Sequence, residues 1–263
     1  MNIYLRELKA HRKSILLWSI FIFMFVIMGM QKYASMNAAG AEEFIKIMDE
    51  LPKSIKAAFG MNKLDVTTLM GYYSVLYIYI VLMMGIQSSM LGSNIISKEE
   101  KEKTSEFLMT KPITRKQVLI SKILAGSTII IFLNILLFAS SLFILSYLDG
   151  DLSLYKLLLL NIGLLFIQLL FMVLGVLISS FKAKKSTNYT MMALIFTYFL
   201  SIIIDIWDKL KVLSIFTPFK YFDSKQIIPN NSLNILYVIL SIILIVIMLF
   251  ISFNKYNKRD LQV

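Results

Sequence analysis

The sequence lacks the residues on which several kinds of catalytic site depend. It contains no cysteine and a single histidine, His11. Without cysteine, disulfides, thiolate nucleophiles and thiolate metal sites are excluded. With one histidine, clusters of histidine around a metal and proton relays between histidines are excluded as well. The phosphate-binding pattern GxxxxGK[ST] is also absent, so we expect neither an enzyme nor a bound cofactor.

Charged residues are also scarce. They make up 16% of the 263 residues, whereas hydrophobic residues make up 58%. Soluble domains usually carry charges at about a quarter of their positions, so water is not the only solvent of this chain. The charged residues that exist separate six uncharged runs, at residues 14–31, 66–97, 123–148, 157–181, 186–204 and 226–254.

Each uncharged run is long enough to cross a membrane as a helix. A helix of about 20 residues spans the roughly 30 Å of hydrocarbon in a bilayer. The runs are continuously apolar, which excludes the alternating strands of a porin-like barrel. We therefore expect a single all-α, polytopic domain over residues 1–263, with an external loop at 32–69 and a polar loop at 97–122. Its spans are predicted near residues 14–31, 70–96, 123–148, 157–181, 187–206 and 233–253.

The distribution of basic residues predicts the orientation. The two termini and the second and fourth loops contain 17 of the 27 lysines and arginines, and the other three segments contain 10. Because basic residues near helix ends stay in the cytoplasm, both termini are placed there. The formal charge of +11 also suits anionic membrane lipid as a partner. It does not indicate nucleic acid, because the charge is spread over short segments without interleaved aromatic residues.

Two polar segments outside the main loop have simple interpretations. Residues 1–13 are predicted either to form a short amphipathic helix on the membrane, with Tyr4, Leu5 and Leu8 on one side, or to be a solvated basic anchor. The segment between the fifth and sixth spans is rich in aromatic residues, a composition typical of anchors at a membrane interface. These residues are Trp207, Phe216, Phe219, Tyr221 and Phe222.

The second loop, 97–122, is the most structured polar segment. Ser97 stands three residues before Glu100, and Thr114 three before Gln117, which is the spacing of a helix-capping box. Pro112 predicts an interruption before Thr114 starts the helix of the third span. Between these signals lies an apolar ridge, Phe107, Leu108 and Met109. An apolar ridge on a charged loop needs a partner, either the membrane or another protein.

The predicted spans carry no charge at mid-membrane depth, which argues against an ion-coupled carrier. Most of their polar residues are expected to form hydrogen bonds between helices. The densest group lies in the second span and is our candidate for a wall of a substrate path. Its members are Gln87, Ser88, Ser89 and Asn94.

The second loop resembles the signature of ATP-binding-cassette permeases of the ABC-2 exporter type. In that signature a Glu-Glu pair is followed by Gly-Thr, a glutamate, leucines, proline with isoleucine or valine, and a basic residue. One position departs from it, since Lys103 stands where the family commonly has glycine. The matching residues are Glu99, Glu100, Thr104, Glu106, Leu108, Pro112, Ile113, Arg115 and Lys122. Over essentially its full length the chain resembles the bacterial branch that includes bacitracin-type and sodium-efflux-type permeases.

The resemblance implies a coupling helix in this loop that docks into a separate ATPase subunit. It implies that Pro112 and Arg115 fix the exit of the segment, while six residues transmit the motion of the ATPase. These six are Glu99, Glu100, Thr104, Glu106, Phe107 and Leu108. ATP and Mg²⁺ would be bound by the ATPase partner and no cofactor by this chain.

The expected assembly adds a second permease copy, as a homodimer or a heterodimer, in the cell (plasma) membrane. Its expected activity is export of an antibiotic, a peptide, a lipid or an ion. Two alternatives remain open from the sequence. One is a stand-alone channel or secondary carrier, and the other is a membrane scaffold that recruits a soluble protein through its second loop.

Overall fold

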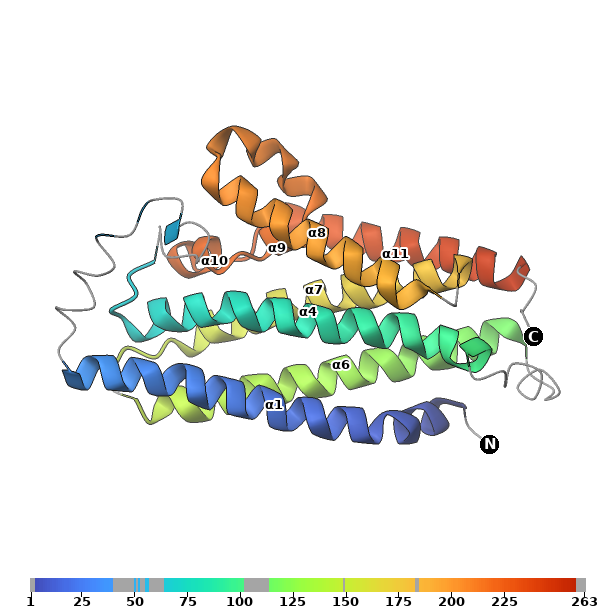
Figure 1. Ribbon diagram of the computed structural model, residues 1–263, viewed down its shortest axis with the longest axis horizontal. Coiled ribbons are helices and arrows are strands. Elements are labelled where there is room, and N and C mark those ends of the chain that lie inside the picture. Colours follow the sequence, from blue (N-terminus) through green and yellow to red (C-terminus); the bar gives the residue numbers. More distant parts are fainter. Residues whose placement is uncertain are drawn as a thin grey trace.

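The computed structural model describes residues 3–39, 50, 52, 55–56, 64–101, 114–148, 150–182 and 185–258. All regular structure in these ranges is helical, and six of the helices are long and apolar enough to cross a membrane. They lie side by side as a bundle (Figure 1). The six are α1 (Ile3–Ala39), α4 (Leu69–Lys101), α6 (Arg115–Ser146), α7 (Leu154–Phe181), α8 (Ser186–Ile206) and α11 (Ile235–Lys258). The prediction of an all-α protein with six membrane-spanning helices is confirmed.

Successive helices run in opposite directions, so the bundle has two distinct ends (Figure 1). At one end α1 begins, α4 ends, α6 begins, α7 ends, α8 begins and α11 ends. We call this the termini end and the other the opposite end. Residues 102–113, which hold most of the predicted coupling helix, lie outside the described residues, but their two flanks are at the termini end.

The helices extend beyond the uncharged runs, which corrects two predictions. Residues 3–13 are not a separate amphipathic helix, because α1 continues without a break from Ile3 into the first span. Ser97 is not a cap, because α4 continues past it to Lys101. The cap at Thr114 is confirmed: its hydroxyl accepts from the Gln117 amide at 3.2 Å, and its own amide donates to Gln117 Oε1 at 3.0 Å.

Helices α4 and α7 form the centre of the bundle, and α1, α8 and α11 cover it with largely exposed apolar faces. Two glycines let the central helices touch. A Cβ atom on Gly92 would lie 2.0 Å from the carbonyl oxygen of Met172, and one on Gly175 would lie 2.6 Å from the amide nitrogen of Ser93. Small residues that allow such close backbone contact are typical of packing between membrane helices.

The connection from α8 to α11 is more compact than the sequence predicted. It contains a 3₁₀ helix, η1 (Asp208–Phe216), followed by α9 (Pro218–Tyr221) and α10 (Ser224–Asn230). Trp207 and Phe216 are exposed, as expected of interfacial anchors, but the prediction is wrong for the other three aromatic residues. Phe219, Tyr221 and Phe222 are buried because α9 and α10 fold back against α4 and α7. Ser224 at the start of α10 donates to the Ser74 carbonyl of α4 at 3.2 Å.

Candidate functional site

A cluster of four charged residues lies at the termini end, directly beside the flanks of residues 102–113. Its centre is Lys122 of α6, which is only 1% exposed. The Lys122 ammonium donates to both carboxylate oxygens of Glu99, at 2.6 and 2.5 Å, and to the Ile95 carbonyl at 2.5 Å. Arg6 of α1 donates to Glu99 and to Glu7, each at 3.1 Å. We call Arg6, Glu7, Glu99 and Lys122 the termini-end cluster.

Helix geometry brings these side chains together. Ile95 and Glu99 are one turn apart, so the Ile95 carbonyl and the Glu99 carboxylate lie on the same side of α4. Lys122, two turns after the Thr114 cap of α6, reaches both groups. A buried ammonium is costly unless it is paired and hydrogen-bonded, and both conditions are met here. Two positive and two negative residues make the cluster neutral. It joins the ends of α1, α4 and α6.

The structure gives some of the predicted coupling residues a clear position. The Glu99 carboxylate turns inward to Lys122, and Glu100 is 6% exposed. Arg115 donates to the Asn257 carbonyl at 3.3 Å and so links the start of α6 to the end of α11. The other predicted coupling residues lie outside the described residues; these are Thr104, Glu106, Phe107, Leu108 and Pro112.

Two of the four predicted path residues share a pocket. Gln87 and Asn94 of α4 line it together with His11 and Trp18 of α1 and with two apolar residues of α6, Ile129 and Leu133. We call it the α1–α4 pocket. Ser88 and Ser89 are buried but are not among the residues that line it. Gln87 and Asn94 are seven residues apart, so they lie on the same side of α4. Ser88 and Ser89 directly follow Gln87 in the sequence and therefore lie on other sides of the helix.

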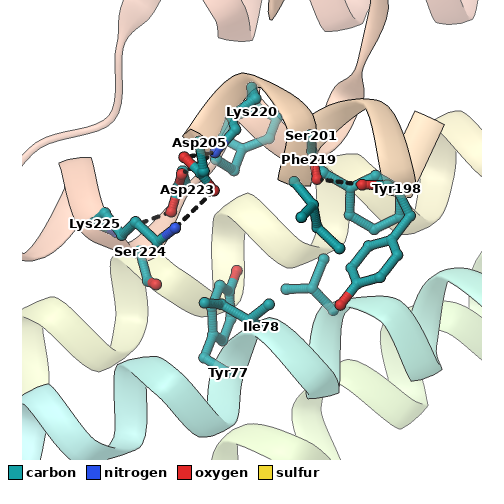
Figure 2. A pocket seen from close by; sticks show the side chains of 13 residues that line it. Tyr77, Ile78, Tyr198, Ser201, Asp205, Phe219, Lys220, Asp223, Ser224 and Lys225 are labelled. Carbon is teal, nitrogen blue, oxygen red and sulfur yellow. Dashed lines mark hydrogen bonds and ion pairs between the residues drawn. The ribbon is translucent and has the colours of Figure 1, made fainter. Parts of the chain in front are cut away.

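A second pocket lies at the opposite end, under four paired charges (Figure 2). Lys220 donates to Asp205 at 2.5 Å and to Asp223 at 2.9 Å, and Lys225 donates to Asp205 at 2.7 Å. We call these residues the opposite-end cluster. Tyr77, Tyr198 and Phe219 are among the residues that line the pocket below them.

The electrostatics of the opposite-end cluster favour its charged form. Burial alone lowers the pKa of Lys220, but Asp223 and Asp205, through charge and hydrogen bonds, outweigh that effect and raise the pKa above its ordinary value. Lys220 is therefore fully charged at neutral pH. The cluster ties the end of α8 to α9 and α10.

Sequence reasoning missed both clusters, although one sign was visible. Lys122 belongs to the loop signature and directly precedes the uncharged run of the third span. A lysine at the edge of a span needs an acidic partner if it is buried, so this position indicated such a partner. The opposite-end cluster had no such sign, because its members pair only after α9 and α10 fold back. Within the described ranges, no group of three His, Cys, Asp or Glu residues is arranged to hold a metal ion.

Comparison with protein families gives a match over nearly the whole chain. A family model described as "ABC-2 family transporter protein" matches residues 1–261. A search of curated proteins finds no match for the chain.

Proposed function

The chain belongs to the ABC-2 family of transporter proteins, and we propose that it is the permease subunit of an exporter driven by a separate ATPase. The family model spans almost the whole chain, and the six apolar helices make it a multi-pass membrane protein. In this proposal ATP and Mg²⁺ are bound by the partner. A second permease copy completes the path, and the termini end faces the cytoplasm of the cell.

The observation that carries the proposal is the termini-end cluster at the base of residues 102–113. Lys122 and Glu99 stand on α6 and α4, the two helices that this segment connects. Because the pair is buried, a force applied to the segment would move α4 and α6 together and would not separate their ends. Arg6 extends the same connection to α1. A docked ATPase would thus move three helices at once.

The loop residues contact the ATPase in this proposal, while Glu99 acts through Lys122. Glu106, Phe107 and Leu108 supply an acidic group and an apolar ridge for a groove on the partner. Glu99 is a positioning residue, because its carboxylate is committed to Lys122 and Arg6. Arg115 holds the far flank of the segment against α11.

If a neighbouring reading frame encodes an ATP-binding-cassette ATPase, co-expression of the two chains tests the proposal. We expect the ATPase to co-purify with the chain and expect Glu106→Ala/Phe107→Ala to abolish both the association and the permease-dependent stimulation of ATP hydrolysis. The matched control is Glu50→Ala/Ile55→Ala, which removes one exposed acidic and one exposed apolar side chain from the segment at the opposite end. This control should retain both properties.

Two results would overturn the proposal. One is failure of any ATPase to co-purify, which would favour a stand-alone channel or carrier. The other is unchanged co-purification and unchanged stimulation in the Glu106→Ala/Phe107→Ala variant, which would remove the assigned docking role from this loop.

A further inference from the structure

The α1–α4 pocket has the shape of a groove between two facing helix surfaces. Its α1 wall runs from His11 to Trp18, and its α4 wall runs from Asn94 to Gln87, so each wall covers eight residues and is about 10 Å long. The helices are antiparallel, which places His11 near the level of Asn94 and Trp18 near the level of Gln87. Ile129 and Leu133 of α6 close the back of the groove.

Two buried polar atoms in this groove have no protein partner among the described residues. Gln87 is only 4% exposed, and its Oε1 atom accepts no hydrogen bond there. The Nε2 atom of His11 is likewise buried without a partner. Buried polar groups in native proteins are nearly always hydrogen-bonded, so an unpaired oxygen on Gln87, a residue that lines a cavity, indicates a donor supplied from outside the chain.

The lining also limits the charge of that donor. The residues that line the pocket include no Asp, Glu, Lys or Arg, and the charged groups that act on His11, which are Glu7, Lys98 and Lys122, lie outside this lining. A formal charge in the groove would therefore lack a counter-ion at membrane depth, which is strongly unfavourable. An uncharged hydroxyl or amide N–H is the donor that fits.

The position of the groove indicates how a ligand would reach it. Asn94 lies seven residues, about 10 Å, before the end of α4, so the groove occupies the half of the bundle nearer the termini end. Met90, which also lines it, is 40% exposed on the side of the bundle, and Ser14 is exposed as well. The groove is thus open sideways, toward the leaflet at the termini end.

We propose that the α1–α4 pocket binds an uncharged amphiphile that enters from this leaflet. Its hydroxyl or amide group donates to Gln87 Oε1, and its apolar chain lies against Trp18, Ile129 and Leu133. The inference deepens the proposed export function, on which it rests for its role, because it identifies the substrate class as a neutral amphiphile with a hydrogen-bond donor.

The chain contains a natural reporter for this binding. Its two tryptophans are Trp18, in the pocket, and Trp207, 63% exposed near the opposite end. Trp207→Phe leaves Trp18 as the single tryptophan of the full chain, which is then reconstituted in phosphatidylcholine vesicles. The probe is the monoglyceride of dibromostearic acid, whose bromines quench indole fluorescence on contact. The comparison probe is the methyl ester of the same acid, which has the same chain and no donor.

We expect saturable quenching of Trp18 by the monoglyceride at a mole fraction about tenfold lower than by the methyl ester, the factor that one hydrogen bond provides. Gln87→Leu should abolish the difference between the two probes. The matched control Gln31→Leu makes the same substitution at an exposed position toward the other end of α1 and should preserve it. Size-exclusion and circular dichroism profiles show whether each variant is folded.

Equal, non-saturating quenching by the two probes would overturn the inference, since it would mean contact with bulk lipid or a pocket filled by water. A difference that survives Gln87→Leu in a folded variant would overturn it as well. No ATPase is present in this experiment, so its failure leaves the coupling proposal intact. Conversely, loss of ATPase association in the loop variants leaves the binding result intact.

Discussion

At the scale of single residues, Lys122 is the side chain whose replacement should have the largest effect. Lys122→Met keeps the length of the side chain and leaves the carboxylate of Glu99, whose side chain is 12% exposed, with only Arg6 as a partner. Breaking a buried ion pair by removing one member costs about 3–5 kcal/mol, and we expect a loss of unfolding free energy in that range. Thermal unfolding in detergent measures it.

Two further variants distinguish the loss of the Lys122–Glu99 pair from the general effect of removing a lysine. Lys116→Met changes an exposed lysine on the same helix and should alter stability by no more than about 0.5 kcal/mol. Lys122→Met/Glu99→Gln removes both charges and should recover part of the loss, because no buried charge is left unpaired. A double variant as unstable as Lys122→Met alone would contradict the assigned pairing.

The sequence predicted residues well where the interaction is local and poorly where it is tertiary. The capping box of Thr114 and Gln117 is set by a spacing of three residues, so it was predicted and is confirmed. The candidate path residues were grouped because they are close in the sequence, and of the four only Gln87 and Asn94 line the same pocket. By contrast, the inward direction of Glu99 depends on Lys122, which lies 23 residues away on another helix, and no local pattern contains that information.

At the scale of helices, the contact between α4 and α7 depends on Gly92. A methyl group there would lie 2.0 Å from the carbonyl oxygen of Met172, a backbone atom that cannot move without its helix. We expect Gly92→Ala to force α4 and α7 apart and to cost at least about 3 kcal/mol, at the upper end for overpacking. The unfolding midpoint in detergent and the yield of monodisperse protein report the effect.

Gly126→Ala on α6 is the matched control for Gly92→Ala. Its new methyl group would come closest to the Met172 sulfur atom, at 3.0 Å, and to the end of the Ile95 side chain, at 3.4 Å. Flexible side chains can yield by the few tenths of an ångström required, and alanine is the better helix former by about 1 kcal/mol. Its effect should therefore be small. Equal damage from the two substitutions would contradict the role of close backbone contact.

The existence of the helices was predictable, but their ends were not. Uncharged runs identify spans because the bilayer excludes unpaired charge, and all six were found on that basis. On the same basis, the second span was predicted to end before Glu99 and the third span to begin after Lys122. In the structure these two charges neutralise each other inside the bundle, so α4 and α6 continue past the limits that hydropathy set.

At the scale of the whole molecule, the number of crossings followed from composition, whereas the return of α9 and α10 into the bundle did not. An aromatic-rich segment between two spans fits surface anchors and buried helices equally well. The outcome is decided by Asp205, Lys220, Asp223 and Lys225, which pair across three elements and so hold α9 and α10 against the body. Such pairing appears only in the assembled fold.

The orientation of the molecule is the last prediction, and the absence of cysteine makes it directly testable. Lys116 and Ser232 are exposed at the termini end and the opposite end, respectively, so Lys116→Cys and Ser232→Cys each introduce one thiol into a background without any other. Basic residues concentrate at the termini end, which should therefore lie in the cytoplasm. A membrane-impermeant maleimide should label Ser232→Cys in intact cells and Lys116→Cys only after permeabilisation. The reverse pattern would place residues 102–113 outside the cell, beyond the reach of any ATP-hydrolysing partner, and would contradict the coupling proposal together with the orientation.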